Sequence, residues 1–195
     1  MKILITGANG FVGRYLKRAL ENFGHEVWGV DCASHSHNVI AVDICDTIKL
    51  HEALREARPD MVYHLAAVSQ VGSGEASIVY KININGTLNL LEGCVALEKM
   101  PKFVFISSSQ VYGIVPDDMQ PIDEKATLNP VNHYGASKAA GEMLVRAFAC
   151  EYGLEYIIFR PFNHTGPGQS DYFVVPKIIK AFKEGAQSIK LGNIY

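Results

Sequence analysis

The sequence has few cysteines, no excess of charge of either sign and no long hydrophobic run. Its 195 residues contain 4 cysteines, 18 Lys and Arg against 20 Asp and Glu, and 48% hydrophobic side chains. Scattered cysteines without a CxxC pair exclude a dense disulfide framework and are typical of free thiols in a reducing cytosol. The balanced charge favours neither nucleic acid nor an anionic membrane as a partner. No apolar run approaches the roughly 18 residues of a membrane span, so we expect a cytoplasmic globular protein.

Short runs rich in Val, Ile, Leu and Phe alternate with longer helical patterns along most of the chain. The expected strands are Lys2–Thr6, Glu26–Val30, Val39–Val42, Met61–Leu65, Lys102–Ser107 and Glu155–Phe159. The expected helices are Phe11–Phe23, Asp46–Glu56, Ser77–Leu97 and Tyr134–Tyr152. Strands that are apolar throughout are typical of parallel strands buried on both faces. The alternation therefore predicts an α/β fold with a doubly wound parallel sheet, the Rossmann fold.

The pattern changes after Arg160, where prolines and glycines interrupt a polar segment. A helix is expected at Pro176–Lys183 and a short strand at Ser188–Leu191. We therefore predict a Rossmann domain over residues 1–160 and the start of a second region over residues 161–195. Because a domain rarely stops on an unpaired strand, we expect this second region to be truncated in the present sequence.

Three glycines lie between the first expected strand and the first expected helix, in the segment TGANGFVG at residues 6–13. Gly7 allows a tight turn, Gly10 lets the backbone approach a phosphate, and Gly13 lets the helix pack close to the strand. The helix that begins at Phe11 and Val12 offers backbone N–H groups and a positive dipole end to the same phosphates. Although the spacing is GxxGxxG rather than GxGxxG, its place between strand and helix predicts a pyrophosphate-binding turn. A purely structural turn is the alternative.

Acidic and small residues follow the next strands at the positions where a dinucleotide would lie. Asp31 ends the second expected strand, and its carboxylate can accept both adenosine ribose hydroxyls while repelling the extra phosphate of NADP. Asp43, followed by Ile44, ends the third strand within reach of the adenine amino group. The segment Leu65–Ala66–Ala67 supplies small residues that let the backbone pass close to the cofactor. We therefore predict NAD as the cofactor in preference to NADP.

Cys32, His35 and His37 form a C-x2-H-x-H cluster beside Asp31. The cluster has no fourth ligand nearby in the sequence, and a structural metal site normally needs four. We therefore interpret it as a solvated loop next to the adenine rather than a metal site.

A tyrosine and a lysine lie four residues apart in the segment YGASK, as Tyr134 and Lys138. On a helix these side chains share one face, about 5–6 Å apart at Cβ. A nearby ammonium stabilises a phenolate, so we expect it to lower the pKa of Tyr134. The run Ser107–Ser109 ends the fifth expected strand, at the sheet edge where ligands bind in open α/β folds. A serine hydroxyl there can hydrogen-bond the same substrate oxygen that Tyr134 protonates.

These segments together resemble the extended short-chain dehydrogenase/reductases that modify nucleotide sugars. The resemblance runs along the whole chain through TGANGFVG, DMVYHLAA, NINGTLNLLE, SSSQVYG, YGASK and RPFNHTGPG. It implies a catalytic Ser108, Tyr134 and Lys138, a family asparagine at Asn85, and a second region that binds substrate. The substrate-side candidates are Ser108, Ser109, Asn163, Val174 and Lys177. The cofactor-binding candidates are Gly7, Gly10, Phe11, Val12, Gly13, Asp31, Asp43, Ile44, Leu65, Ala66, Ala67, Asn85, Tyr134, Lys138 and Pro161.

Members of this family differ in the reaction that they catalyse. Dehydratases carry a Glu where Gln110 stands, and an amide cannot act as a general base, so dehydration is disfavoured. The segment from Arg160 to Gln169 is most similar to GDP-4-keto-6-deoxy-mannose reductases, whereas SSSQVYG is more similar to epimerases. We favour reduction of a 4-keto group on a nucleotide-linked 6-deoxy sugar, with a 4-epimerase as the alternative. A cofactor-sensing regulatory protein without catalysis is the alternative from another class, and the intact Ser108, Tyr134 and Lys138 argue against it.

A homodimer is expected from the two longest helices. Ser77–Leu97 and Tyr134–Tyr152 carry small and apolar positions, such as Ala136, Ala139 and Met143, that suit packing of helix on helix across a two-fold axis. The alternative is that these positions only face the sheet of their own chain.

Overall fold

The computed structural model describes residues 1–33, 38–69 and 75–191. It divides into two compact units, Met1–Phe162 and Asn163–Tyr195. The strands of the first unit are β1 (Lys2–Thr6), β2 (Glu26–Asp31), β3 (Val39–Ala41), β4 (Met61–His64), β5 (Lys102–Ile106) and β6 (Tyr156–Phe159). Its helical segments are α1 (Phe11–Asn22), α2 (Thr47–Ala57), α3 (Ala76–Tyr80), η1 (Lys81–Asn85), α4 (Gly86–Val95), η2 (Ser109–Val111), η3 (Asp117–Met119) and α5 (His133–Tyr152). The second unit contains α6 (Val174–Lys183).

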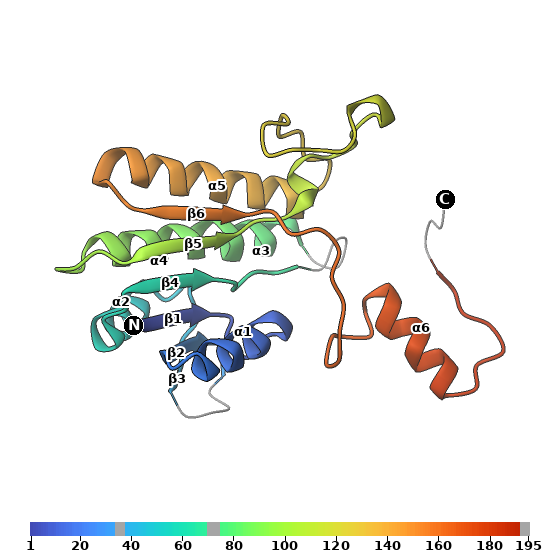
Figure 1. Cartoon of the computed structure of the whole chain (residues 1–195), viewed down its shortest axis with the longest axis horizontal. Helices are drawn as coiled ribbons and strands as arrows, with labels where there is room; N and C mark the ends of the chain where they lie inside the picture. The colour runs from blue at the N-terminus through green and yellow to red at the C-terminus, as the bar shows by residue number, and fades with distance from the viewer. Residues whose placement is uncertain (34–37, 70–74, 192–195) are drawn as a thin grey trace. The chain divides into compact units, whose positions relative to one another are not determined.

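The six strands form one parallel sheet in the order β3-β2-β1-β4-β5-β6 (Figure 1). This is the strand order of the Rossmann fold, so the prediction of a doubly wound parallel sheet is confirmed. The order reverses between β1 and β4, and ligands of open α/β sheets bind at such a reversal, outside the carboxyl ends of the strands. The glycine turn follows β1, and the serine run follows β5, at this same edge.

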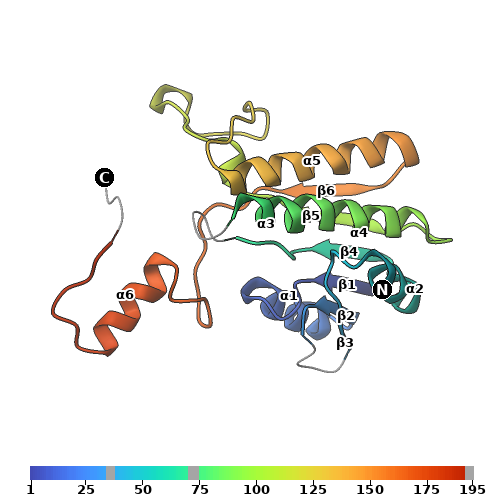
Figure 2. The same ribbon diagram turned by 180° about the vertical axis from the view of Figure 1, so that it is seen from behind.

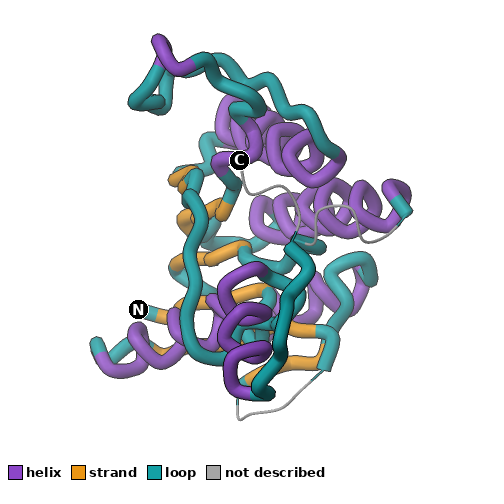
Figure 3. The backbone as a smooth tube through the Cα atoms, turned by 90° about the vertical axis from the view of Figure 1, so that its right-hand side faces the viewer, coloured by secondary structure: helices purple, strands orange, loops and turns teal. Residues whose placement is uncertain are grey.

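Helices cover both faces of the sheet (Figure 3). One face packs against α2, α4 and α5 through a large apolar cluster that includes Leu54, Leu91, Phe103 and Val145. The opposite face packs against α1 through Leu16 and a smaller cluster of β1 and β2 residues. β1 and β2 are therefore largely buried on both faces, as the sequence predicts, whereas one face of β6 is exposed at Ile157 and Phe159.

The helix expected at Ser77–Leu97 is divided into three segments, α3, η1 and α4, which run along α5 (Figures 1 and 2). The middle segment, Lys81–Asn85, is a π-helix, whose wider turn shifts the following residues around the helix axis. Asn83 in this segment is 2% exposed. Its amide side chain bonds both backbone groups of Val68 and donates to the Ser137 hydroxyl on α5 at 2.9 Å. The wide turn thus joins the stretch after β4 to α5.

The strand expected at Ser188–Leu191 is wrong, because these residues have no strand conformation. A strand needs a partner to pair its backbone groups. Within the described residues 163–191 of the second unit there is one helix and no strand. Other predicted boundaries differ from the structure by one or two residues. Among the residues that the structure describes, no helix is both long and apolar enough to cross a lipid bilayer.

A buried histidine joins the first and fourth strands at the edge that carries the glycine turn. His64 is 1% exposed, and its ring nitrogens lie 2.7 Å from the Thr6 hydroxyl and 2.8 Å from the Thr87 hydroxyl. The Thr87 hydroxyl donates to the Asn83 carbonyl at 2.6 Å, so it accepts from the histidine Nε2–H. The Thr6 hydroxyl then donates to Nδ1 and itself accepts from the Ala66 N–H. His64 is therefore held neutral in one tautomer.

The buried His64 predicts a loss of stability in acid. Burial, with a smaller contribution from Lys138, lowers the pKa of His64 from 6.5 to about 3. Between these values the unfolded chain binds a proton that the folded chain excludes, so stability falls as the pH falls below about 6.5. From about pH 7 to about pH 5, the wild type should lose about 2 kcal/mol more unfolding free energy than His64→Gln in urea titrations. Equal losses in the two proteins would contradict this assignment.

Candidate active site

The glycine turn after β1 has the geometry that its sequence predicts. Gly7 has φ +71°, a conformation that favours glycine, and Gly10 donates to the Gly7 carbonyl at 3.0 Å. A Cβ on Gly13 would lie 2.2 Å from the Gly7 oxygen, so only glycine lets α1 approach the turn this closely. The helix begins at Phe11, followed by Val12. The turn therefore brings a helix N-terminus to the reversal point of the sheet, where a phosphate can bind.

Asp31 lies at the end of β2 and contacts the glycine turn directly. Its Oδ2 accepts from the backbone N–H of Asn9 at 2.9 Å, and the Asn9 side chain donates to the Ala33 carbonyl. The carboxylate thus holds the turn in place besides offering an acceptor for ribose hydroxyls. The sequence suggested only the second role.

The remaining predicted cofactor residues differ in how exposed they are and in what they contact. Asp43 is exposed, and its Oδ1 accepts from the Cys45 N–H at 2.9 Å. Ile44 is 5% exposed, with its side chain in the core and its carbonyl accepting from the Asn89 side chain. The backbone at Leu65 and Ala66 passes close to Gly7, because a Cβ on Gly7 would lie 2.9 Å from the Ala66 nitrogen. Ala67 is partly exposed beside them.

Ser108, Tyr134 and Lys138 come together at the carboxyl end of β5. Ser108 is 8% exposed and caps the start of η2, where its hydroxyl accepts from the Gln110 N–H at 3.2 Å. The Tyr134 phenol lies near enough to Ser108 for hydrogen bonding with the serine to lower the pKa of the phenol. Lys138 is 3% exposed, donates to the Ile106 carbonyl at 2.8 Å and lies 5.1 Å from the centre of the Phe105 ring. A phenol and a serine hydroxyl are therefore presented side by side, with an ammonium one helical turn away.

The expected lowering of the Tyr134 pKa is wrong. Burial raises the pKa of the Tyr134 phenol, and the hydrogen bond from Ser108 lowers it by less. The ammonium of Lys138 points at the Ile106 carbonyl, and burial lowers the pKa of this lysine to about 8. A phenol that keeps its proton at neutral pH is suited to donate a proton to a substrate oxygen.

The first turn of α5 is built against η2. The Asn132 side chain caps the helix by accepting from the Gly135 N–H at 2.8 Å, and it donates to the Gln110 side chain at 2.9 Å. A Cβ on Gly135 would lie 2.5 Å from the Gln110 carbonyl oxygen. This close approach brings the neighbouring Tyr134 to Ser108.

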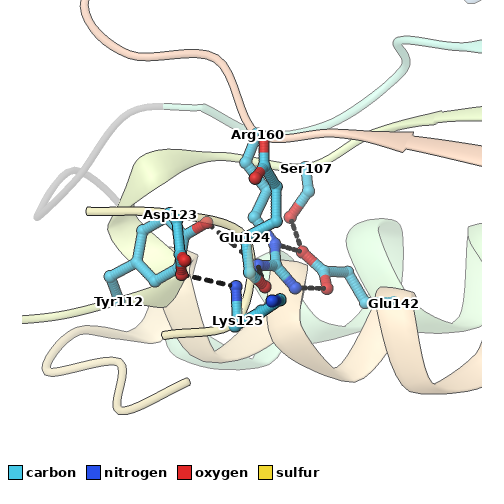
Figure 4. A network of polar contacts seen from close by, with 7 residues as sticks. All are labelled: Ser107, Tyr112, Asp123, Glu124, Lys125, Glu142 and Arg160. Atoms are coloured by element: carbon cyan, nitrogen blue, oxygen red, sulfur yellow. Dashed lines mark hydrogen bonds and ion pairs between the residues drawn. The ribbon is translucent and has the colours of Figure 1, made fainter. Parts of the chain in front are cut away.

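The structure contains a buried ion pair next to this site that the sequence patterns did not predict. Glu142 is fully buried and binds Arg160 through two hydrogen bonds, and it also accepts from Ser107 (Figure 4). Glu142 could have been found from its spacing, since it lies on the helix face of Tyr134 and Lys138. The sequence also placed the family asparagine at Asn85, which is exposed, whereas the buried Asn83 contacts α5.

The substrate-side candidates divide between the two units. Ser108 and Ser109 belong to the first unit, where the Ser109 N–H donates at 3.0 Å to the carbonyl of Pro161, a cofactor-binding candidate. Asn163, Val174 and Lys177 belong to the second unit and are exposed. The Lys177 ammonium donates to the Lys190 carbonyl at 2.7 Å. A role for these residues in substrate binding stays a prediction.

The metal alternative concerns residues that are only partly described. His35 and His37 lie outside the described residues. In the described ranges, no group of three or more His, Cys, Asp or Glu side chains is placed to hold a metal ion.

Comparison with known proteins identifies the family. The sequence model of the NAD dependent epimerase/dehydratase family matches residues 3–194. The chain is 35% identical to the GDP-6-deoxy-D-talose 4-dehydrogenase of Aggregatibacter actinomycetemcomitans, covering 100% of this chain and 63% of that protein. It is 34% identical to the GDP-6-deoxy-D-mannose reductase of Pseudomonas aeruginosa, covering 97% of this chain and 62% of that protein.

A solved structure gives the same result. The UDP-glucose 4-epimerase of Thermus thermophilus, in complex with NAD, superposes with a TM-score of 0.84 at 31% identity, covering 94% of this chain and 62% of that one. The chain therefore belongs to the NAD dependent epimerase/dehydratase family. It spans less than two thirds of the length of these three relatives.

Two substitutions of Asp31 separate its hydrogen bond to the Asn9 N–H from its expected role as an acceptor for the ribose hydroxyls. Asp31→Ser should weaken NAD(H) binding by about tenfold, the effect of about 1.4 kcal/mol, because an acceptor for ribose and the brace on Asn9 are both lost. Asp31→Asn removes the charge but keeps an oxygen for the Asn9 N–H, so it should retain more affinity. Both variants should improve the ratio of NADP(H) to NAD(H) affinity in calorimetry. A wild type that already prefers NADPH would refute this role.

Proposed function

We propose that this chain carries the cofactor-binding and catalytic residues of an NAD-dependent enzyme that reduces the 4-keto group of a GDP-linked 6-deoxy sugar. The observation that supports this most is the joint placement of Ser108, Tyr134 and Lys138 at the sheet edge where the glycine turn opens α1. Dinucleotides bind at this reversal of strand order in Rossmann folds. Relatives in the same family supply the sugar class, because two of them are named for GDP-6-deoxy sugars.

The residues present fit a bound dinucleotide. The glycine turn and the start of α1 would hold the pyrophosphate, and Asp31 would hold the adenosine ribose. A lysine such as Lys138, with an ammonium at the sheet edge, is suited to the second ribose. When bound, the reduced nicotinamide supplies the hydride for the sugar carbon.

In this proposal, the protein residues manage the proton and the carbonyl oxygen. The Tyr134 phenol donates its proton to the oxygen at C4, which becomes the hydroxyl of the product. Ser108 donates a hydrogen bond to the same oxygen and thereby orients it beside Tyr134. Burial raises the pKa of Tyr134, so the phenol is protonated at the start of the reaction, as reduction requires. Solvent then reprotonates the phenolate.

The side chain at Gln110 supports reduction over dehydration. Its amide oxygen accepts from the Asn132 amide at 2.9 Å, and an amide has no basic site that could remove a proton from a sugar carbon. Reduction needs only the hydride and the proton from Tyr134, and neither step uses a base at this position. The 4-epimerase alternative is favoured by the similarity to the Thermus thermophilus enzyme.

A panel of sugar nucleotides separates these functions. The purified protein is incubated with NADH and either GDP-4-keto-6-deoxy-mannose, GDP-sugars or UDP-glucose, while NADH absorbance and product configuration are followed. Stoichiometric loss of NADH with the keto sugar supports the reductase. Inversion at C4 without net change in NADH would favour the epimerase. Binding of NADH without turnover of any sugar would favour a cofactor-sensing protein.

Removal of the Tyr134 hydroxyl tests the proton donor. Tyr134→Phe keeps the ring in place but removes the transferable proton, so kcat should fall by about 10²- to 10⁴-fold with little change in NADH affinity. Tyr152→Phe, at the far end of α5 where the side chain is 48% exposed, is the matched control and should leave kcat unchanged. Turnover of Tyr134→Phe within a few-fold of the wild type would place the proton donor elsewhere.

A further inference from the structure

The charged pair of Glu142 and Arg160 is unusual for its burial. The Glu142 side chain is 0% exposed and that of Arg160 is 10% exposed. Arg160 Nε donates to Glu142 Oε1 at 2.8 Å and Nη2 donates to Oε2 at 2.7 Å. Two parallel bonds between a guanidinium and a carboxylate fix their orientation as well as their distance. The hydrogen bonds to Glu142 raise the pKa of Arg160, so the arginine stays charged.

Arg160 also holds the segments that follow the serine run. Its Nη1 donates to the Tyr112 hydroxyl at 2.9 Å and to the Glu124 carbonyl at 3.0 Å (Figure 4). The guanidinium carbon lies 5.1 Å from the centre of the Tyr112 ring, within the range of a cation–π interaction. One side chain from the end of β6 therefore connects α5, the segment after η2 and the loop at Glu124.

Glu142 in turn connects the pair to the end of β5. Its Oε1 accepts from the Ser107 hydroxyl at 2.6 Å. Tyr134, Lys138 and Glu142 are spaced four residues apart on α5, so they lie on one helix face. Lys138 donates to the Ile106 carbonyl, Glu142 accepts from the Ser107 hydroxyl, and Tyr134 lies beside Ser108, which lowers the pKa of its phenol. The helix is thus fastened to three consecutive residues of the β5 terminus.

Backbone hydrogen bonds pair the residues on either side of Ser108 with those on either side of Arg160, and the register of β5 and β6 continues to place Arg160 beside Ser107. The Ser107 N–H donates to the Phe159 carbonyl at 2.7 Å, and the Ser109 N–H donates to the Pro161 carbonyl at 3.0 Å. Ser108 and Arg160 are therefore the central residues of two short segments paired to each other. Any shift of Arg160 along β6 moves the backbone on both sides of Ser108.

Stability alone gives little reason to keep a buried ion pair here. Replacing such a pair with apolar side chains of similar volume is often neutral or stabilising, whereas removing one partner leaves a buried charge without compensation. What apolar side chains cannot reproduce is the orientation of the forked pair and its bonds to Ser107, Tyr112 and Glu124. The first of these partners, Ser107, directly precedes Ser108 of the candidate active site.

We propose that the Glu142–Arg160 pair is a positioning device, which fixes Ser108 opposite Tyr134 by holding β5, β6 and α5 in one register. The role in catalysis rests on the proposed function, since it assumes that Ser108 and Tyr134 act on one substrate oxygen. The positioning itself does not depend on the substrate. It can be read from Tyr134 directly, because the Ser108 hydrogen bond opposes the rise of the Tyr134 pKa that burial causes.

The test replaces both charges together. In the purified protein, Glu142→Leu/Arg160→Met should unfold at a urea midpoint near that of the wild type. Its kcat should fall by about 10- to 100-fold, the effect of misplacing a catalytic group, while KM and the NADH dissociation constant change by less than about threefold. The Tyr134 pKa should rise, and Ser108→Ala should raise it in the same direction. This pKa is measured from the phenolate absorbance that disappears when Tyr134→Phe is added to each protein.

The matched control removes an ion pair that joins the same two strands at the opposite edge. Lys102 begins β5 and Glu155 directly precedes β6; their charged groups lie 3.6 Å apart, and the two side chains are 39% and 78% exposed. Lys102→Gln/Glu155→Gln should leave kcat and the Tyr134 pKa at wild-type values. If the double variant at 142 and 160 fails to fold, Ser107→Ala/Tyr112→Phe removes two bonds of the pair without leaving a buried charge unpaired. It should raise the Tyr134 pKa and lower kcat in the same direction.

A folded variant with wild-type kcat and an unchanged Tyr134 pKa would overturn the positioning role and leave the pair as packing alone. An unchanged Tyr134 pKa in Ser107→Ala/Tyr112→Phe would overturn it equally. A wild type that turns over no sugar nucleotide would refute the proposed function, yet the tyrosine titration would still decide whether the pair positions Ser108.

Discussion

The candidate site depends on how closely α5 lies against the carboxyl end of β5. Contact is possible because the helix has glycines where it meets the strand: a Cβ on Gly141 would lie 2.5 Å from the Phe105 ring. From this position three side chains of one helix face reach the last residues of β5 and the serines that follow. If a larger side chain at this position pushed α5 away from β5, all three contacts would be broken together. Packing of an apolar sheet therefore sets the geometry of a polar site.

A second set of buried polar contacts carries that geometry to the glycine turn. Thr6 ends β1 directly before Gly7, and its hydroxyl begins a chain of hydrogen bonds through His64 and Thr87 to Asn83. The Asn83 amide then contacts Ser137, which lies next to Lys138 on α5. Buried networks of this kind resist distortion, because breaking any one hydrogen bond leaves a buried polar group with neither a protein partner nor a water molecule to bond. The turn that would bind a pyrophosphate and the helix that would supply a proton are thereby held in a fixed relation.

Much of this arrangement could be predicted from the sequence. The rest could not, because it depends on contacts between elements that lie far apart in the sequence. Apolar strands, the glycine turn and the i, i+4 spacing of Tyr134 and Lys138 are local patterns, and the structure bears out the sheet that they predict. The partnership of Glu142 with Arg160 joins residues from two different elements, and local periodicity gives no information on such pairs. The π-helical turn at Lys81–Asn85 moves Asn83 rather than Asn85 into the interior. The direction of the Tyr134 pKa depends on burial and on where the Lys138 ammonium points, which spacing alone does not determine.

The proposed function requires that one phenol gives a proton to an oxygen while a hydride reaches the carbon that bears it. Isotope transfer tests this most directly. NADH with deuterium at the transferable position of the nicotinamide would be incubated with GDP-4-keto-6-deoxy-mannose, and the product analysed by NMR. The account predicts deuterium at C4 of the sugar, and solvent hydrogen on the new hydroxyl. Product without deuterium at C4, or with deuterium at another carbon, would contradict it.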